Sequence, residues 1–143
     1  MTLLVSACLL GLCTRYDGGT KPCESVLRLA QKHTLVPVCP EQLGGLSTPR
    51  APAEQQKDGR VQNRKGQDVT EAYTRGAQNA LTIYRLSRCE GAILKARSPS
   101  CGRDCVYDGT FTGTLVRGSG VFAALCQENG IKVYTEEDDL SAL

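Results

Sequence analysis

The sequence lacks several features that would assign it at once to a common class of metal or catalytic site. Among its 143 residues there is one histidine, His33, and its eight cysteines include no C-x2-C pair. Structural zinc sites commonly pair their ligands in this way, and redox dithiols use the same spacing, so both kinds of site are disfavoured. A single histidine at a predicted helix end gives little support to a Cys–His nucleophile.

Signals for nucleotides, nucleic acids and membranes are also absent. No glycine cluster has the spacing of a phosphate loop or a dinucleotide fingerprint after a strand. No apolar stretch is long enough to span a bilayer. The formal net charge is only +2, so the composition marks neither a nucleic-acid-binding surface nor a membrane-binding one. We therefore expect no membrane association and find no indication of nucleic-acid binding.

Cysteine is the residue type that stands out. Disulfide frameworks are typical of small secreted chains that carry a signal peptide. The apolar start MTLLVSACLLGLC has no Lys or Arg before it, so it lacks the basic segment that opens a signal peptide. We expect a cytoplasmic, reducing location in which the cysteines are free thiols or metal ligands.

Short apolar runs alternate with segments of helical periodicity along the chain. The runs predict strands at residues 3–6, 34–38, 92–95 and 131–134. The periodic segments predict helices at residues 23–30, 69–84 and 121–126, with Gly91 ending the second and Ser119 capping the third. Pro37 places the second strand at a sheet edge or brings it to its end, because proline cannot donate a hydrogen bond to a neighbouring strand.

This alternation implies right-handed βαβ units. We predict an α/β fold with a single domain over residues 1–143: a Rossmann-like three-layer sandwich with a mostly parallel sheet of four to five strands. The polar segment 42–67 has no helical period. A segment of this length inside a compact domain is usually functional or contains a small hairpin, for which residues 59–61 and 65–66 give turn signals.

The positions of three cysteines indicate what this single α/β domain, residues 1–143, binds, and they predict an iron–sulfur cluster. Cys8, Cys39 and Cys101 come after the first, second and third predicted strands. Since ligands of open α/β sheets bind at the carboxyl ends of the strands, these three thiols are expected to converge there. Soft thiolates suit an iron–sulfur cluster, and three ligands on a four-iron cluster leave one iron open to a soft substrate atom such as sulfur.

The other cysteines divide into two groups. Cys13 and Cys105 are each either a fourth ligand or a bystander. Cys23, Cys89 and Cys126 fall on predicted helices or just after one, where a free cysteine usually packs as a small apolar residue.

Several polar residues are expected near the same edge. Glu41 could carry protons as a general acid or base, or be a solvated residue at a strand end. Ser98 and Ser100 could orient a substrate or a water, or bond the backbone of their own turn. Arg50, on the long loop, could reach over the site. The expected rim residues are Arg15, Asp17, Lys95 and Arg97.

Three blocks of the chain together resemble one known family. The first block is Ser6-Ala7-Cys8-Leu9-Leu10-Gly11 with Arg15-Tyr16-Asp17-Gly18, and the second is Cys39-Pro40-Glu41 with Gly44-Gly45-Leu46 and Thr48-Pro49-Arg50. The third is Ser98-Pro99-Ser100-Cys101-Gly102 with Tyr107-Asp108-Gly109, followed by a tail from Gly118 to Glu136. These blocks resemble a family of small bacterial proteins, long of unknown function, that includes the iron–sulfur-dependent thiouracil desulfurases.

The resemblance implies a [4Fe-4S] cluster held by Cys8, Cys39 and Cys101, with the fourth iron binding the substrate sulfur. It implies a desulfurase that removes sulfur from a thiolated nucleobase such as 2-thiouracil by non-redox hydrolysis. Glu41 would be the acid/base, Ser98 the assisting serine, and Ser100 a second candidate for that role. In one respect the chain departs from the family, because Thr14 stands where a cysteine often precedes the Arg-Tyr-Asp.

Two other functions remain open at the level of the sequence. One is an electron-transfer or binding module whose cluster is fully ligated, with Cys13 or Cys105 as the fourth ligand. The other is a structural zinc domain without catalysis. For the desulfurase, the partner is a small thiolated nucleobase, although thiolated RNA stays possible as a substrate, and no oligomeric state is predicted.

Overall fold

A four-stranded parallel sheet forms the centre of the structure, a computed structural model that describes residues 1–143. Its strands are β1 (Thr2–Ser6), β2 (Thr34–Val38), β5 (Gly91–Leu94) and β8 (Val133–Thr135), in the order β2-β1-β5-β8. Strand β2 therefore lies at an edge, as Pro37 predicts, since its missing N–H is tolerated there. All four strands lie within about two residues of their predicted positions.

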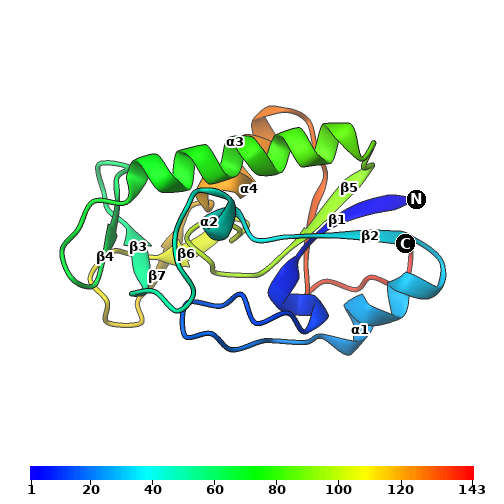
Figure 1. The fold of residues 1–143 in the computed structure, drawn as a ribbon, viewed down its shortest axis with the longest axis horizontal. Coiled ribbons are helices and arrows are strands. Elements are labelled where there is room, and N and C mark those ends of the chain that lie inside the picture. Colours follow the sequence, from blue (N-terminus) through cyan, green and yellow to red (C-terminus); the bar gives the residue numbers. More distant parts are fainter.

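Helices cover both faces of this sheet, which confirms the predicted α/β three-layer sandwich (Figure 1). On one face, α3 (Thr70–Leu86) and α4 (Val121–Glu128) pack over Leu4. On the other, α1 (Glu24–Leu27) and the 3-10 turn η2 (Arg28–Gln31) pack over Leu3 and Val5. Strand β1 is buried on both faces, which explains why it has a continuous apolar run rather than alternation. No helix of the structure combines the length and the apolar character needed to cross a membrane.

Two short antiparallel hairpins lie at the end of the molecule away from both termini (Figure 1). The first joins β3 (Ala53–Gln55) to β4 (Val61–Asn63) and confirms the hairpin expected in the long polar segment. The second joins β6 (Cys105–Tyr107) to β7 (Leu115–Arg117), in a glycine-rich stretch for which the sequence predicted no element. Two one-turn elements, η1 (Ala7–Leu10) and α2 (Pro40–Leu43), follow β1 and β2 directly.

Two predicted helix boundaries are wrong. Helix α3 ends at Leu86, because the chain turns at Arg88 in a left-handed conformation with φ of 54°, and Gly91 instead begins β5. Helix α4 is capped by Gly120 rather than Ser119. A Cβ atom on Gly120 would lie 2.4 Å from the carbonyl carbon of Ser100, so close packing against the Cys101 loop requires glycine at this position.

Helix α2 packs on α3 through two glycines. A Cβ atom on Gly44 would lie 1.9 Å from the carbonyl oxygen of Ala72, and one on Gly76 would lie 1.9 Å from the carbonyl oxygen of Pro40. Neither position has room for a side chain, so the two helix backbones approach each other directly. This contact sets the position of α2, which begins immediately after Cys39.

An ion pair ties the segment after Cys101 to the last strand. Arg103 donates from Nη1 to Asp138 Oδ2 at 2.6 Å and from Nη2 to Oδ1 at 3.0 Å. Its Nη1 also donates to the carbonyl oxygen of Val133 at 2.9 Å. The hydrogen bonds from Arg103 hold the pKa of Asp138 below its ordinary value, against a smaller opposing effect of burial.

Replacing Asp138 with asparagine is expected to lower the free energy of unfolding at pH 7 by about 1 kcal/mol, since the pair is partly exposed. A carboxyl group whose pKa is lowered by folding stabilises the protein above its unfolded-state pKa, and this contribution disappears as the pH falls through the folded-state pKa. The difference between wild type and Asp138→Asn should therefore shrink toward about pH 3 in urea denaturation. If wild type and Asp138→Asn differed in free energy of unfolding by the same amount at pH 7 and at pH 3, the assignment would be wrong. The control is Glu128→Gln, which removes an exposed carboxyl group.

Candidate functional site

Three cysteine thiols meet at the carboxyl edge of the sheet. Cys8 lies in η1 directly after β1, Cys39 follows β2, and Cys101 lies in the loop after β5. Because β2, β1 and β5 are neighbours in the sheet, their carboxyl ends lie side by side. All three cysteines line one cavity of about 540 Å³. The strand order thus brings together three residues that are far apart in the sequence.

Burial controls the protonation of these thiols. It raises the pKa of Cys8 to about 11, although nearby Lys95 lowers it again in part. Burial also raises the pKa of Cys39 and Cys101, and the negative charge of Glu41 raises both further. In the absence of a bound metal all three are therefore neutral thiols, and metal binding would displace their protons.

The donor set fits a cluster better than a single ion. No three His, Cys, Asp or Glu side chains are placed to hold one metal ion. The cavity instead presents three sulfur donors around a space of about 540 Å³, which has room for a group larger than a single ion. Sulfur-only ligation is the preference of iron–sulfur clusters, whereas the geometry gives no support to the structural zinc alternative.

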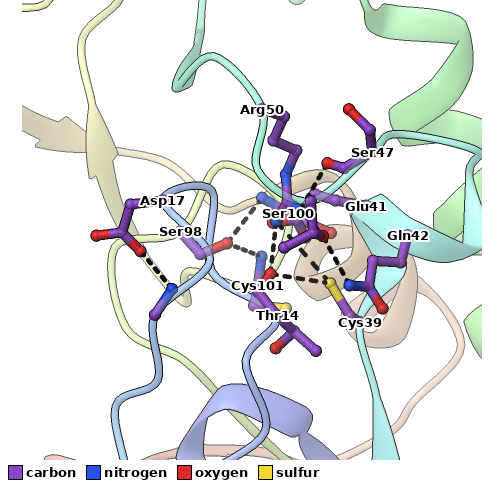
Figure 2. A network of polar contacts seen from close by, with 12 residues as sticks. Thr14, Asp17, Cys39, Glu41, Gln42, Ser47, Arg50, Ser98, Ser100 and Cys101 are labelled. Carbon is purple, nitrogen blue, oxygen red and sulfur yellow. Dashed lines mark hydrogen bonds and ion pairs between the residues drawn. The ribbon is translucent and has the colours of Figure 1, made fainter.

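Glu41 and Arg50 form a nearly buried ion pair beside the thiols (Figure 2). The distance from Arg50 Nη2 to Glu41 Oε2 is 3.2 Å, and their side chains are 8% and 14% exposed, respectively. The same Nη2 donates to the carbonyl oxygen of Thr14 at 2.9 Å and lies 4.0 Å from Cys39 Sγ. Burial raises the pKa of Glu41, and the positive charge of Arg50 opposes this shift. Arg50 thus reaches the site, as expected, and holds the carboxylate in place.

The two candidate serines differ in position. Ser98 lines the cavity, and its Oγ accepts hydrogen bonds from the backbone N–H groups of Ser100 at 3.2 Å and Cys101 at 3.0 Å. Ser98 therefore shapes the loop that presents Cys101 and keeps its own proton available. Ser100 is fully buried and does not line the cavity. Its Oγ adjoins Glu41 and slightly lowers the pKa of that group, but it completes no hydrogen bond.

Neither candidate for a fourth ligand lines the cavity. Cys13 is exposed, and Cys105 begins β6 at the base of the second hairpin. The remaining cysteines are also outside the cavity: Cys126 is a core residue on the buried face of α4, and Cys23 and Cys89 pack at the edges of the two main cores. Three of the eight cysteines therefore line the cavity, and the other five lie outside it.

Most of the expected rim residues line the cavity. Arg15, Lys95 and Arg97 do so, whereas Asp17 instead accepts a hydrogen bond from the Gly19 N–H within its own turn. Lys95 is fixed by Glu136, whose Oε2 lies 2.7 Å from its Nζ. Arg97 is paired in the same way with Glu137, whose Oε2 lies 3.0 Å from its Nη1. Two of the three rim cations are therefore held by the segment that follows β8.

Several residues that line the cavity were not singled out from the sequence, and Tyr73 and Glu54 are two of them. Tyr73 lies in a helix that was predicted only from its apolar periodicity. Glu54, on β3, accepts hydrogen bonds at Oε1 from the N–H groups of Gly109 and Phe111, which joins the two hairpins beside the cavity. No local sequence pattern predicts this pairing, because it links residues more than fifty positions apart.

Comparison with known proteins assigns the family. A family model described as 2-thiouracil desulfurase matches residues 3–138. The chain belongs to the 2-thiouracil desulfurase family. It is 39% identical over 145 residues to the uncharacterized protein YbbK of Bacillus subtilis (strain 168), across 95% of this chain and 96% of YbbK. It also resembles the solved structure of the [4Fe-4S]-dependent thiouracil desulfidase TudS, with a TM-score of 0.90 and 41% identity, over 99% of this chain and 94% of TudS.

Membership of the 2-thiouracil desulfurase family confirms the resemblance carried by the three sequence blocks. It also confirms the α/β fold class, because the TudS fold is shared over nearly the whole chain. The chain is a homologue of a [4Fe-4S]-dependent desulfidase, so the cofactor class and the enzyme class expected from the sequence are confirmed at the level of the family.

Proposed function

We propose that this chain removes sulfur from a thiolated nucleobase such as 2-thiouracil by a hydrolysis that depends on a [4Fe-4S] cluster. The observation that carries the proposal is the meeting of three thiols, from three adjacent strand ends, in one cavity beside a buried carboxylate. The family match and the likeness to TudS support the same chemistry.

Cys8, Cys39 and Cys101 would hold the cluster. When bound through three protein ligands, it supplies a Lewis-acidic iron with an affinity for a soft sulfur atom. The absence of Cys13 and Cys105 from the cavity lining favours this arrangement over a fully ligated electron-transfer cluster.

The reaction replaces a C=S group by a C=O group at the expense of one water. A bond forms between the water oxygen and the ring carbon, the C–S bond breaks, and sulfur leaves as hydrogen sulfide, so no electrons are gained or lost. Glu41 would take the proton from the attacking water and return a proton to the substrate. Arg50 orients this carboxylate by binding Oε2.

Ser98 would assist by donating its hydroxyl proton to the bound substrate. Its oxygen is already occupied by two backbone N–H groups, which fix the direction of the side chain. Ser100 is the weaker candidate for this role, because it does not line the cavity.

Turnover by the anaerobically reconstituted protein tests the proposal. We expect uracil and sulfide to form from 2-thiouracil in equal amounts, with no added electron donor or acceptor, and oxygen from ¹⁸O-labelled water to enter the uracil. A cluster-loaded protein that converts nothing, or that requires a reductant, would favour the electron-transfer alternative. The same assay with the 2-thiouracil nucleoside and with thiolated RNA would determine which form of the base is accepted.

A further inference from the structure

A buried tyrosine lines the cavity and has no role in the chemistry described so far. Tyr73 projects from α3, and its ring packs with Ala53 and Val61 of the first hairpin. The residue is only 3% exposed to solvent, yet it lines the cavity that holds the three cysteines. A phenylalanine would make the same apolar contacts, so packing alone does not account for the hydroxyl.

Tyr73 shares the lining of the cavity with Glu41, Arg50, Cys39 and Cys101. Burial raises the pKa of its hydroxyl group, and the negative charge of Glu41 raises it further. The phenol is therefore protonated throughout the neutral range and is a hydrogen-bond donor. The Tyr73 oxygen makes no hydrogen bond within the chain. It is nevertheless not one of the fully enclosed polar atoms that lack a partner, so it remains accessible from the cavity.

The neighbouring groups have other hydrogen-bonding partners. Arg50 already donates hydrogen bonds to Glu41, Thr14 and Thr48. The ionised carboxylate of Glu41 only accepts hydrogen bonds, so it cannot donate one to a carbonyl oxygen. Tyr73 thus provides a neutral donor from a helix that carries none of the three thiols. A uracil that carries one sulfur still has one carbonyl oxygen, and a neutral O–H group is a suitable donor for a neutral carbonyl oxygen.

We propose that the Tyr73 hydroxyl donates a hydrogen bond to the carbonyl oxygen that a thiolated uracil retains beside its C=S group. The inference rests on the proposed function and extends it, because it makes Tyr73 a residue that touches the substrate and selects for its oxo group. A site built to bind a carbonyl discriminates against analogues that lack it.

The Tyr73→Phe variant removes the hydroxyl and keeps the ring. We expect it to bind uracil about 10-fold more weakly by calorimetry and to lower kcat/KM for 2-thiouracil by about 10-fold, the size of one neutral hydrogen bond. Its iron content and melting temperature should match those of the wild type. Tyr84→Phe, which alters a half-buried tyrosine on the same helix, is the matched control.

A second substrate separates a direct contact from a structural effect. Pyrimidine-2-thione has the C=S group of 2-thiouracil but no carbonyl, so wild type and Tyr73→Phe should process it with equal kcat/KM. An equal loss on both substrates, or no loss on either, would overturn the proposal. If the cluster-loaded wild type neither bound uracil nor released sulfide, the proposed function itself would fail, and this would be visible without any variant.

Discussion

Replacing Glu41 with glutamine is expected to lower kcat for 2-thiouracil by about 100-fold to 10,000-fold, the range associated with loss of a general acid–base group. Glutamine keeps an oxygen that can accept the hydrogen bond from Arg50, so the buried guanidinium retains a partner. It cannot take a proton from water. The iron and sulfide content should therefore stay at the wild-type level while turnover is lost.

Alanine at position 41 should also abolish turnover but is the less clean experiment. It would leave Arg50, 8% exposed, without its carboxylate, and an unpaired buried charge destabilises a protein strongly. Glu71→Gln is the control, since that side chain is 94% exposed on α3. Turnover retained by the Glu41→Gln variant would remove Glu41 from the mechanism and leave the cluster assignment untouched.

Loss of any one of Cys8, Cys39 and Cys101 is expected to abolish both the cluster and turnover. Wild type should take up about four irons and four acid-labile sulfides per chain on anaerobic reconstitution. Each of the three alanine variants should fall well below this ratio, because two thiolates from this cavity cannot replace three. The visible absorption of the cluster should disappear in parallel.

The matched controls for this series are Cys13→Ala and Cys105→Ala. Neither residue lines the cavity, so both variants should keep wild-type iron, sulfide and turnover. Circular dichroism would verify that all five variants fold. A cluster lost on replacing Cys105 would point to a fourth protein ligand, and therefore to the electron-transfer alternative. Full iron content in the Cys101→Ala variant would refute the assigned ligand set.

Strand positions and thiol convergence could be predicted because both follow from strong, local signals. Strand β1 is buried on both faces, so its apolar run is unbroken, and Pro37 is compatible with only a few places in a sheet. Once the strands alternate with helices, chain topology places Cys8 and Cys39 at the same edge. No side-chain detail is needed for that step.

Other features depend on contacts between distant segments and leave no local pattern. All three residues of β7 are exposed, so it lacks the alternation of apolar and polar residues that predicts a strand. The cap of α4 is Gly120 because the loop at Ser100 leaves no space for a Cβ atom. Tyr73 has the same helical spacing as the core residues of α3, so the sequence does not distinguish it from them. That it lines the cavity depends on where the ends of the strands lie, which is a property of the tertiary structure.

The contact between α2 and α3 has a consequence for assembly. Gly44 and Gly76 fix the segment that carries Cys39 and Glu41, and Gly120 fixes the loop that carries Cys101, all through contacts within the polypeptide. The conformational entropy of arranging these groups is therefore lost when the chain folds, before any iron arrives. When the protein segments that carry the ligands are already ordered, binding does not have to offset the entropy of ordering them. More of the free energy of the iron–sulfur bonds then contributes to affinity. The same packing leads us to expect that these backbone segments keep their positions when a cluster binds.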